Sequence, residues 1–261
     1  MGVTSTRPLV KSAERTVRLL EVLGASATPL TLAEIHQITG YPKSSLHELV
    51  QTLIALRWLE ATPDGLAFSI GTSALLTGTA YLDADPSVPH AVRHLEELQA
   101  EVGYTAHFAR LDGAHVIYLA SKETTEKRHV TSRVGRKLPA ASTALGRAVL
   151  AERTDAELAA ILADSSGAPW GVDEPHEADL DKLSPALGEA RERGYAVERG
   201  QTNPGIACVA VAVSYRIPAT DAISCSLPID RASPEELERV AGAIAAHAEA
   251  LTGELRRAGV R

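Results

Sequence analysis

Apolar residues recur three or four positions apart in the first part of the chain, which is the spacing of an amphipathic helix. The stretch 12–23 follows this pattern and predicts a helix that ends at Gly24. Thr31 and Glu34 have the spacing of a capping box, in which each side chain satisfies a free backbone amide at a helix start. We therefore expect a short second helix that runs from this point to about Thr39.

After the second helix the sequence indicates a turn, a third helix and then a segment in which apolar and polar residues alternate. Residues 40–42 read Gly-Tyr-Pro and favour a turn, and apolar positions within 46–56 mark one face of a third helix. Two helices around a tight turn that contains glycine are typical of a helix-turn-helix. Apolar residues of 57–70 alternate after a Pro-Asp-Gly turn, which predicts a two-stranded wing.

The chain divides after the wing. Residues 72–82 lack strong helix breakers and predict a linker helix, which the prolines within 83–89 interrupt. We expect a winged helix-turn-helix domain over 1–72, a linker helix over 73–87 and a second domain over 88–261. A length of 261 residues suits two unequal domains.

The second domain is expected to mix helices with an antiparallel sheet, and the whole chain is therefore α+β. The predicted helices span 88–102, 143–152, 155–163, 180–193 and 233–257, and the predicted strands span 107–111, 116–120, 130–134, 208–215 and 223–227. Pro234 suits the first turn of the closing helix.

Composition indicates a globular protein that functions without a membrane. Apolar residues make up 45% and charged residues 23% of the chain, and no apolar run approaches the roughly 20 residues that span a bilayer. The N-terminal residues lack the pattern of a secretory signal, so we expect a cytoplasmic protein. Cys208 and Cys225 are the two cysteines, too few for a disulfide framework or a thiolate zinc site. No cofactor is expected.

Charge distribution excludes a protein that coats nucleic acid but permits one that reads a specific site. The formal net charge is −7, whereas coating DNA requires many Lys and Arg residues at phosphates. The acidic excess lies entirely beyond residue 75, because residues 1–75 carry six basic and six acidic side chains. A neutral N-terminal domain beside an acidic remainder is compatible with DNA binding at the N-terminus.

Motifs of common enzymes are missing from the sequence. It contains no Gly-x-Ser-x-Gly elbow, no phosphate-binding Gly-Lys-Ser/Thr and no Gly-x-Gly-x-x-Gly. His90 and His94 are four residues apart, but no third metal ligand is evident, so we expect a solvated helix face. Cys208 has no evident base beside it in the sequence. The chain is therefore not expected to be an enzyme.

Several segments stand out when they are taken together. In chain order they are Gly40-Tyr41-Pro42-Lys43-Ser44-Ser45-Leu46-His47, Ser132-Arg133-Val134-Gly135, Leu138-Pro139 with Thr143-Ala144-Leu145-Gly146-Arg147-Ala148, Arg193-Gly194-Tyr195-Ala196-Val197, Pro204-Gly205-Ile206-Ala207-Cys208-Val209-Ala210, and Ile223-Ser224-Cys225-Ser226. With these segments in this order, the chain resembles the IclR-type transcriptional regulators from about residue 12 to the last helix. The resemblance implies a winged helix-turn-helix joined to a GAF-like effector-binding domain, in homodimers or dimers of dimers. It also implies a regulator, more often a repressor, that binds operator double-stranded DNA and a small-molecule effector.

The resemblance assigns roles to residues of the third helix. Its pattern alone fits either a solvated face or a face that reads DNA, and the resemblance favours the major groove for Lys43, Ser44, Ser45, His47 and Gln51. We expect Arg57 and Lys11 to contact the DNA backbone. Glu48 stands where the family often has a basic residue, so non-specific affinity for DNA is expected to be low.

The resemblance also assigns an effector site. Backbone amides at Ala144 and Leu145 would hold oxygen atoms of the ligand, and the side chains that complete the pocket would be Glu198, Cys208, Ser224 and Ser226. Ala141 stands where the family commonly has a histidine, which leaves room for an aromatic or carboxylate-type metabolite. The alternative is a GAF-like small-molecule-binding module or minor hydrolase without a direct role at DNA.

Overall fold

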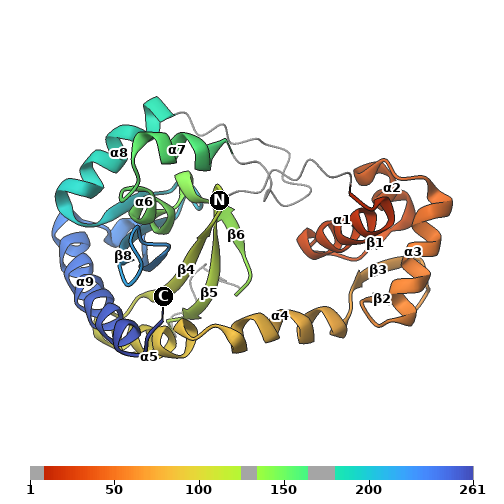
Figure 1. The fold of residues 1–261 in the computed structure, drawn as a ribbon, viewed down its shortest axis with the longest axis horizontal. Coiled ribbons are helices and arrows are strands. Elements are labelled where there is room, and N and C mark those ends of the chain that lie inside the picture. Colours follow the sequence, from red (N-terminus) through yellow and green to blue (C-terminus); the bar gives the residue numbers. More distant parts are fainter. Residues whose placement is uncertain (1–8, 125–133, 164–179, 261) are drawn as a thin grey trace. The chain divides into compact units, whose positions relative to one another are not determined.

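The structure is a computed structural model that describes residues 9–124, 134–163 and 180–260 (Figure 1). The described residues up to Leu82 form one compact unit, and those from Asp83 onward form another. The N-terminal unit contains α1 (Lys11–Ala25), β1 (Leu30–Thr31), α2 (Leu32–Thr39), α3 (Lys43–Ala55), β2 (Leu59–Ala61), β3 (Ala67–Ile70) and most of α4 (Thr72–Ala84).

The predicted helix-turn-helix and its wing are present in the N-terminal unit. Thr31 and Glu34 form the capping box, because Thr31 Oγ1 accepts the Glu34 amide at 3.3 Å and Glu34 Oε2 accepts the Thr31 amide at 2.7 Å. Gly40 adopts a left-handed conformation with φ of 68° and donates its amide to the His36 carbonyl at 2.8 Å. These contacts end α2 and direct the chain into α3.

Two details of this unit differ from the prediction. Helix α1 continues through Gly24 and ends at Ala25, because a helix accommodates one glycine at a modest cost near its end. The wing sheet has three antiparallel strands in the order β1-β3-β2, and the two-residue strand β1 is too short to produce an alternating pattern. Buried side chains from the three helices and the sheet form one core: Leu19, Leu23, Ile35, Leu46, Val50, Leu53, Leu59 and Phe68.

The C-terminal unit is built around a six-stranded antiparallel sheet in the order β6-β5-β4-β9-β8-β7. Its strands are β4 (Thr105–Asp112), β5 (His115–Lys122), β6 (Lys137–Pro139), β7 (Ala196–Arg199), β8 (Ile206–Val213) and β9 (Asp221–Pro228). Its helical elements are α5 (Ser87–Val102), η1 (Ala140–Ser142), α6 (Ala144–Leu150), α7 (Asp155–Leu162), α8 (Leu180–Arg193), η2 (Ile229–Arg231) and α9 (Pro234–Arg257). The α+β prediction is confirmed.

Helices cover both faces of this sheet (Figure 1). Helices α5 and α9 pack side by side on one face, over buried residues such as Phe108 and Ile223. Helices α6 and α8 lie on the other face, where Ala109, Ala210 and Ala222 join their core. The alanines on the strands let the short helix α6 approach the sheet closely.

Most predicted elements of this unit are present, with shifted ends. The closing helix begins as predicted, because Ser233 Oγ accepts the Glu236 amide at 3.2 Å and Pro234 follows at the first helical position. Strands β6 and β7 were not predicted, since three or four residues are too few to show alternation. The strand predicted over 130–134 lies outside the described residues except for Val134, which is in a turn. Among the described helices, none combines the length and hydropathy needed to cross a bilayer.

Candidate functional site

Helix α3 presents a continuous polar face to solvent. Its buried face consists of Leu46, Val50 and Leu53, which pack in the core of the N-terminal unit. Its exposed side chains recur at helical spacing on the opposite side: Lys43, Ser44, His47, Glu48, Gln51 and Thr52. A helix held by three core residues, with a polar outer face of about three turns, has the form of a recognition helix.

Ser45 lies at the edge of this face and is half-buried. Its hydroxyl accepts a hydrogen bond from the Arg15 guanidinium at 3.2 Å, and the same guanidinium lies 5.3 Å from the centre of the Tyr41 ring. The hydroxyl proton of Ser45 can still be donated, because this bond uses only an oxygen lone pair. Ser45 therefore fixes α3 against α1 while keeping one polar function.

Arg57 follows α3 and is exposed, with a left-handed φ of 61°. Its carbonyl accepts the Ser73 amide at 3.1 Å, which connects this turn to the start of α4. Gly71 lies against this turn, and a Cβ at Gly71 would be 2.6 Å from the Arg57 carbonyl oxygen. Close backbone packing thus holds Arg57 at the base of the wing.

A row of polar side chains crosses the sheet of the C-terminal unit on the face covered by α6. Paired residues of an antiparallel ladder point to the same side, and the register pairs His107 with both Ser121 and Ser224, and Ser226 with Cys208. His107 Nε2 lies 3.2 Å from Ser226 Oγ, and His107 Nδ1 lies 3.0 Å from Ser121 Oγ. Cys208 Sγ lies 3.3 Å from Ser226 Oγ. We call His107, Ser121, Cys208, Ser224 and Ser226 the polar row.

Glu198 extends the polar row onto β7, where it pairs with Cys208 in the register. Its side chain is buried, and its carboxylate accepts the backbone amides of Gln201 and Thr202, the latter at 3.1 Å. The sequence suggested Glu198 as an acceptor for a ligand, and the structure shows that much of this capacity is used by the turn after β7.

Arg147 connects the start of α6 to the same turn. Its Nε donates to the Ala141 carbonyl at 2.8 Å, one Nη donates to the Val197 carbonyl at 3.2 Å, and the other donates to Gln201. Burial lowers the pKa of Arg147, and the nearby Glu198 carboxylate opposes this effect. Arg147 therefore fixes Ala141 relative to β7.

The predicted backbone donors lie at the first turn of α6. Thr143 caps the helix, and its Oγ1 accepts the Gly146 amide at 3.0 Å. Ala144 and Leu145 are buried, and α6 lies so close to η1 that a Cβ at Gly146 would be 2.1 Å from the Ala140 carbonyl oxygen. The structure thus places these residues over the sheet face that carries the polar row.

The polar row is uncharged at neutral pH. Burial, with a smaller effect of Arg136, lowers the pKa of His107 to about 4. Burial raises the pKa of Cys208 to about 12, so its sulfur is a thiol and a poor nucleophile. Burial also raises the pKa of Tyr118, whose ring packs edge-on against His107 with 5.3 Å between centroids. These neutral groups can donate and accept hydrogen bonds to a ligand.

Sequence reasoning missed His107, Ser121 and Tyr118 as members of this site. The available signal was a histidine in a strand, on the same side as the polar Thr105 and flanked by Ala106 and Phe108. Ser121 and Tyr118 carry no local signal, because a bulge at Phe108 and Ala109 offsets β5 from β4 and brings Tyr118 to the His107 side.

The predicted solvated face at His90 and His94 is wrong for His94. This side chain is 5% exposed, because α5 packs against α9 at this point, and its Nδ1 lies 3.1 Å from His247 Nδ1.

An open cavity of about 360 Å³ lies between α6, α8 and β8 and is lined by residues that include Glu152, Arg191 and Tyr195. None of the predicted effector residues lines this cavity.

Both parts of the chain match known domains. Residues 12–63 match the IclR helix-turn-helix domain, and residues 79–252 match the C-terminal domain of bacterial IclR transcriptional regulators. The chain is 30% identical over 232 residues to the HTH-type transcriptional regulator XynR of Escherichia coli, which is 88% of this chain and 91% of XynR. It is 26% identical to the transcriptional repressor IclR of Escherichia coli, with 87% of this chain and 84% of the repressor covered.

A solved structure shares the whole fold. It is an IclR homologue complexed with 4-hydroxybenzoate from Microbacterium hydrocarbonoxydans, with a TM-score of 0.73 and 22% identity, and the match covers 94% of this chain and 99% of that one. The winged helix-turn-helix with its polar face on α3 lies in the part of the chain that matches the IclR helix-turn-helix domain, and the family's C-terminal domain matches the rest. The chain therefore belongs to the IclR family of DNA-binding transcriptional regulators.

Proposed function

We propose that this regulator is a repressor whose operator affinity is controlled by a small molecule held at the polar row. The observation that carries the proposal is the polar row itself, a set of neutral hydrogen-bonding groups on four neighbouring strands beneath α6. Buried polar groups cost free energy unless they are paired, so a protein that keeps several together has a use for them. The relative named a repressor supports the direction of regulation.

The DNA-binding residues of the proposal are those on the outer face of α3. Ser44, His47 and Gln51 would read base edges, while Lys43 and Arg57 would contact phosphates. Ser45 would contribute through its remaining proton. The proposed domains are 1–72 for DNA binding, 73–87 as the linker helix and 88–261 for the effector.

A homodimer on a pseudo-palindromic operator completes this proposal. Helix α4 has no buried residue, and it exposes apolar side chains that a second copy could cover, namely Leu75, Leu76 and Tyr81. A single short DNA-binding domain without net charge makes few contacts with DNA, and a dimer doubles their number. Half-sites would then lie about 10 base pairs apart, or a multiple of that spacing.

The proposed effector has an oxygen-bearing polar head and a ring or branched body. Its head would meet the amides of Ala144 and Leu145 and the hydroxyls of Ser224 and Ser226, with Cys208 and Glu198 at one side. An aromatic acid agrees with the 4-hydroxybenzoate in the related structure. The small side chain of Ala141 leaves room for such a body.

The decisive experiment is footprinting of the full-length protein on the DNA upstream of its own gene, with and without aromatic acids. We expect a protected, two-fold symmetric site whose occupancy falls when the effector is added. The effector and the operator must weaken each other's binding by the same factor. The corresponding coupling free energy is typically about 1–3 kcal/mol. Protein that binds aromatic acids but protects no DNA would instead favour the alternative, a small-molecule-binding module without a role at DNA.

A further inference from the structure

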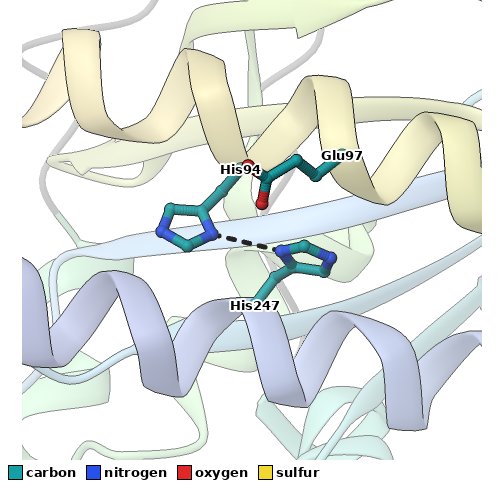
Figure 2. Close-up of side chains that lie close together, drawn as sticks. All are labelled: His94, Glu97 and His247. Carbon is teal, nitrogen blue, oxygen red and sulfur yellow. Dashed lines mark hydrogen bonds between the residues drawn. The ribbon is translucent and has the colours of Figure 1, made fainter.

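Helices α5 and α9 bring two histidines together far from the polar row, on the opposite face of the sheet. His94 comes from α5 and His247 from α9, and their Nδ1 atoms face each other at 3.1 Å (Figure 2). Glu97 lies one turn after His94 on the same helix, and its carboxylate points toward the two rings (Figure 2). One ligand atom from each of the three side chains lies within 4.8 Å of the other two.

Carboxylates behind both rings influence which nitrogen carries the proton. His94 Nε2 lies 3.5 Å from Glu254 Oε2, and His247 Nε2 lies 3.4 Å from Glu101 Oε2. A carboxylate favours an N–H on the nitrogen that faces it, so both rings are directed toward the tautomer with the proton on Nε2. The hydrogen bond between the two Nδ1 atoms, however, requires one ring to carry its proton on Nδ1, so without a further ligand the two rings cannot both keep the proton on Nε2.

A cation bonded to both Nδ1 atoms would replace this hydrogen bond and let each ring keep its proton on Nε2, facing a carboxylate. Zinc bonds to histidine nitrogen at about 2.0–2.1 Å, so two nitrogens of a tetrahedral site lie about 3.3 Å apart. The distance of 3.1 Å is already close to that value. His94 Nε2 is buried and makes no hydrogen bond among the described residues, and its contact with Glu254 Oε2 at 3.5 Å is electrostatic.

We propose that His94, His247 and Glu97 bind a divalent transition-metal ion of the zinc class and clamp α5 to α9. Two imidazoles and one carboxylate are a ligand set that zinc and cobalt accept, and solvent would supply the fourth ligand beside the exposed Glu97. Glu254 and Glu101 would orient the rings from behind, as carboxylates do in many zinc sites.

Protons compete for the same nitrogens. The groups that face the pair are Glu97, Glu101 and Glu254, which favour a positive charge there, and Arg93, which opposes it. His90 shares Glu254, with 3.3 Å between His90 Nδ1 and Glu254 Oε2. His94 is buried where α5 packs against α9, and burial disfavours the charged imidazolium, which could not bind a metal.

The test is titration of the full-length, chelator-treated protein with Zn²⁺ and Co²⁺ at pH 7. Wild-type protein should bind one Co²⁺ with the visible spectrum of a nitrogen- and oxygen-ligated tetrahedral ion, and without the near-ultraviolet thiolate band that binding at Cys208 would produce. His247→Gln and Glu97→Gln should each weaken binding by about tenfold or more. Zn²⁺ should raise the melting temperature of the wild type but not of these variants.

Glu96→Gln is the matched control. Glu96 is adjacent to Glu97 on α5 but turns away to Lys122, with 2.9 Å between the charged atoms. This variant should keep the affinity and spectrum of the wild type. His247 and Glu97 are more exposed than His94, so their substitution should leave the fold intact, which circular dichroism checks. Equal Co²⁺ affinity and spectra in Glu96→Gln, Glu97→Gln and His247→Gln would overturn the proposal, as would a thiolate band.

Discussion

His107 and Ser226 share a hydrogen bond of 3.2 Å between neighbouring strands β4 and β9, inside the C-terminal unit. The other ring nitrogen of His107 lies 3.0 Å from the hydroxyl of Ser121. Hydroxyls can donate or accept, so a neutral imidazole is satisfied in either tautomer. An imidazolium would be a buried charge that no carboxylate of the described residues contacts by a hydrogen bond. The polar row therefore depends on a neutral His107.

This relationship predicts a loss of stability in acid. The pKa of His107 falls from 6.5 in the unfolded chain to about 4 in the folded protein, because the ring is buried. Between these values the unfolded chain binds a proton that the folded protein does not, so the free energy of unfolding decreases as the pH falls from about 6.5 to 4. The full effect is about 3 kcal/mol.

Urea unfolding at pH 7 and pH 4.5 measures this effect. His107→Gln should lose less stability than the wild type on acidification, whatever its stability at pH 7. His36→Gln, a change in the N-terminal unit, should show the pH dependence of the wild type. Parallel losses in wild type and His107→Gln would mean that His107 is protonated in the folded protein.

A second prediction concerns the ion cluster at Arg110. Its guanidinium bonds to Asp221 at 2.7 Å and also pairs with Asp85, while Tyr215 donates to Asp221 at 2.7 Å. Asp221 is fully buried, so Arg110→Met would leave an unpaired buried charge. We expect a loss of about 3–5 kcal/mol in urea unfolding. The double variant Arg110→Met with Asp221→Asn should recover part of this loss. If the losses of the two single variants simply add in the double variant, Arg110 and Asp221 are not coupled.

The sequence predicted the elements whose signals are local, and missed those that depend on pairing. Thr31 with Glu34, and Ser233 with Pro234, carry their caps within four residues, so those helix starts were found. Strands β1, β6 and β7 are recognisable only by their partners. The polar row likewise needs the register that puts Cys208, Ser226 and His107 together across three strands.

The wrong prediction at His94 has the same physical cause. Its helix spacing to His90 was visible, but burial came from α9, about 150 residues away in the chain. His247 and Glu254 lie on that helix and have no local signal that connects them to α5. Contacts between distant helices are decided by packing of the whole domain and not by periodicity within one segment.

A third prediction separates base reading from phosphate contact on α3. His47→Ala and Ser44→Ala should reduce discrimination between operator and random DNA, because exposed polar groups there would meet base edges. Glu48→Arg should raise the affinity for all DNA, because it replaces a repulsive carboxylate with a cation. It should also steepen the salt dependence of binding by about one released counterion. Fluorescence anisotropy across a salt series measures both effects. An unchanged salt slope in Glu48→Arg would place this face away from phosphates.

The last prediction tests the size of the effector site through Ala141. This residue lies in η1 next to the start of α6, and Arg147 fixes its carbonyl at 2.8 Å. Ala141 is half-buried against the core that includes Leu145, so a larger side chain at this position would occupy space beside the polar row. Ala141→His should therefore weaken binding of aromatic acids by about tenfold or more while small 2-oxo acids are less affected, since packed interiors leave little spare volume. Thermal shift and operator release, followed with both ligand classes, measure the change. If the wild type preferred the smallest acids, and Ala141→His still bound the aromatic ones equally well, the argument from volume would be wrong.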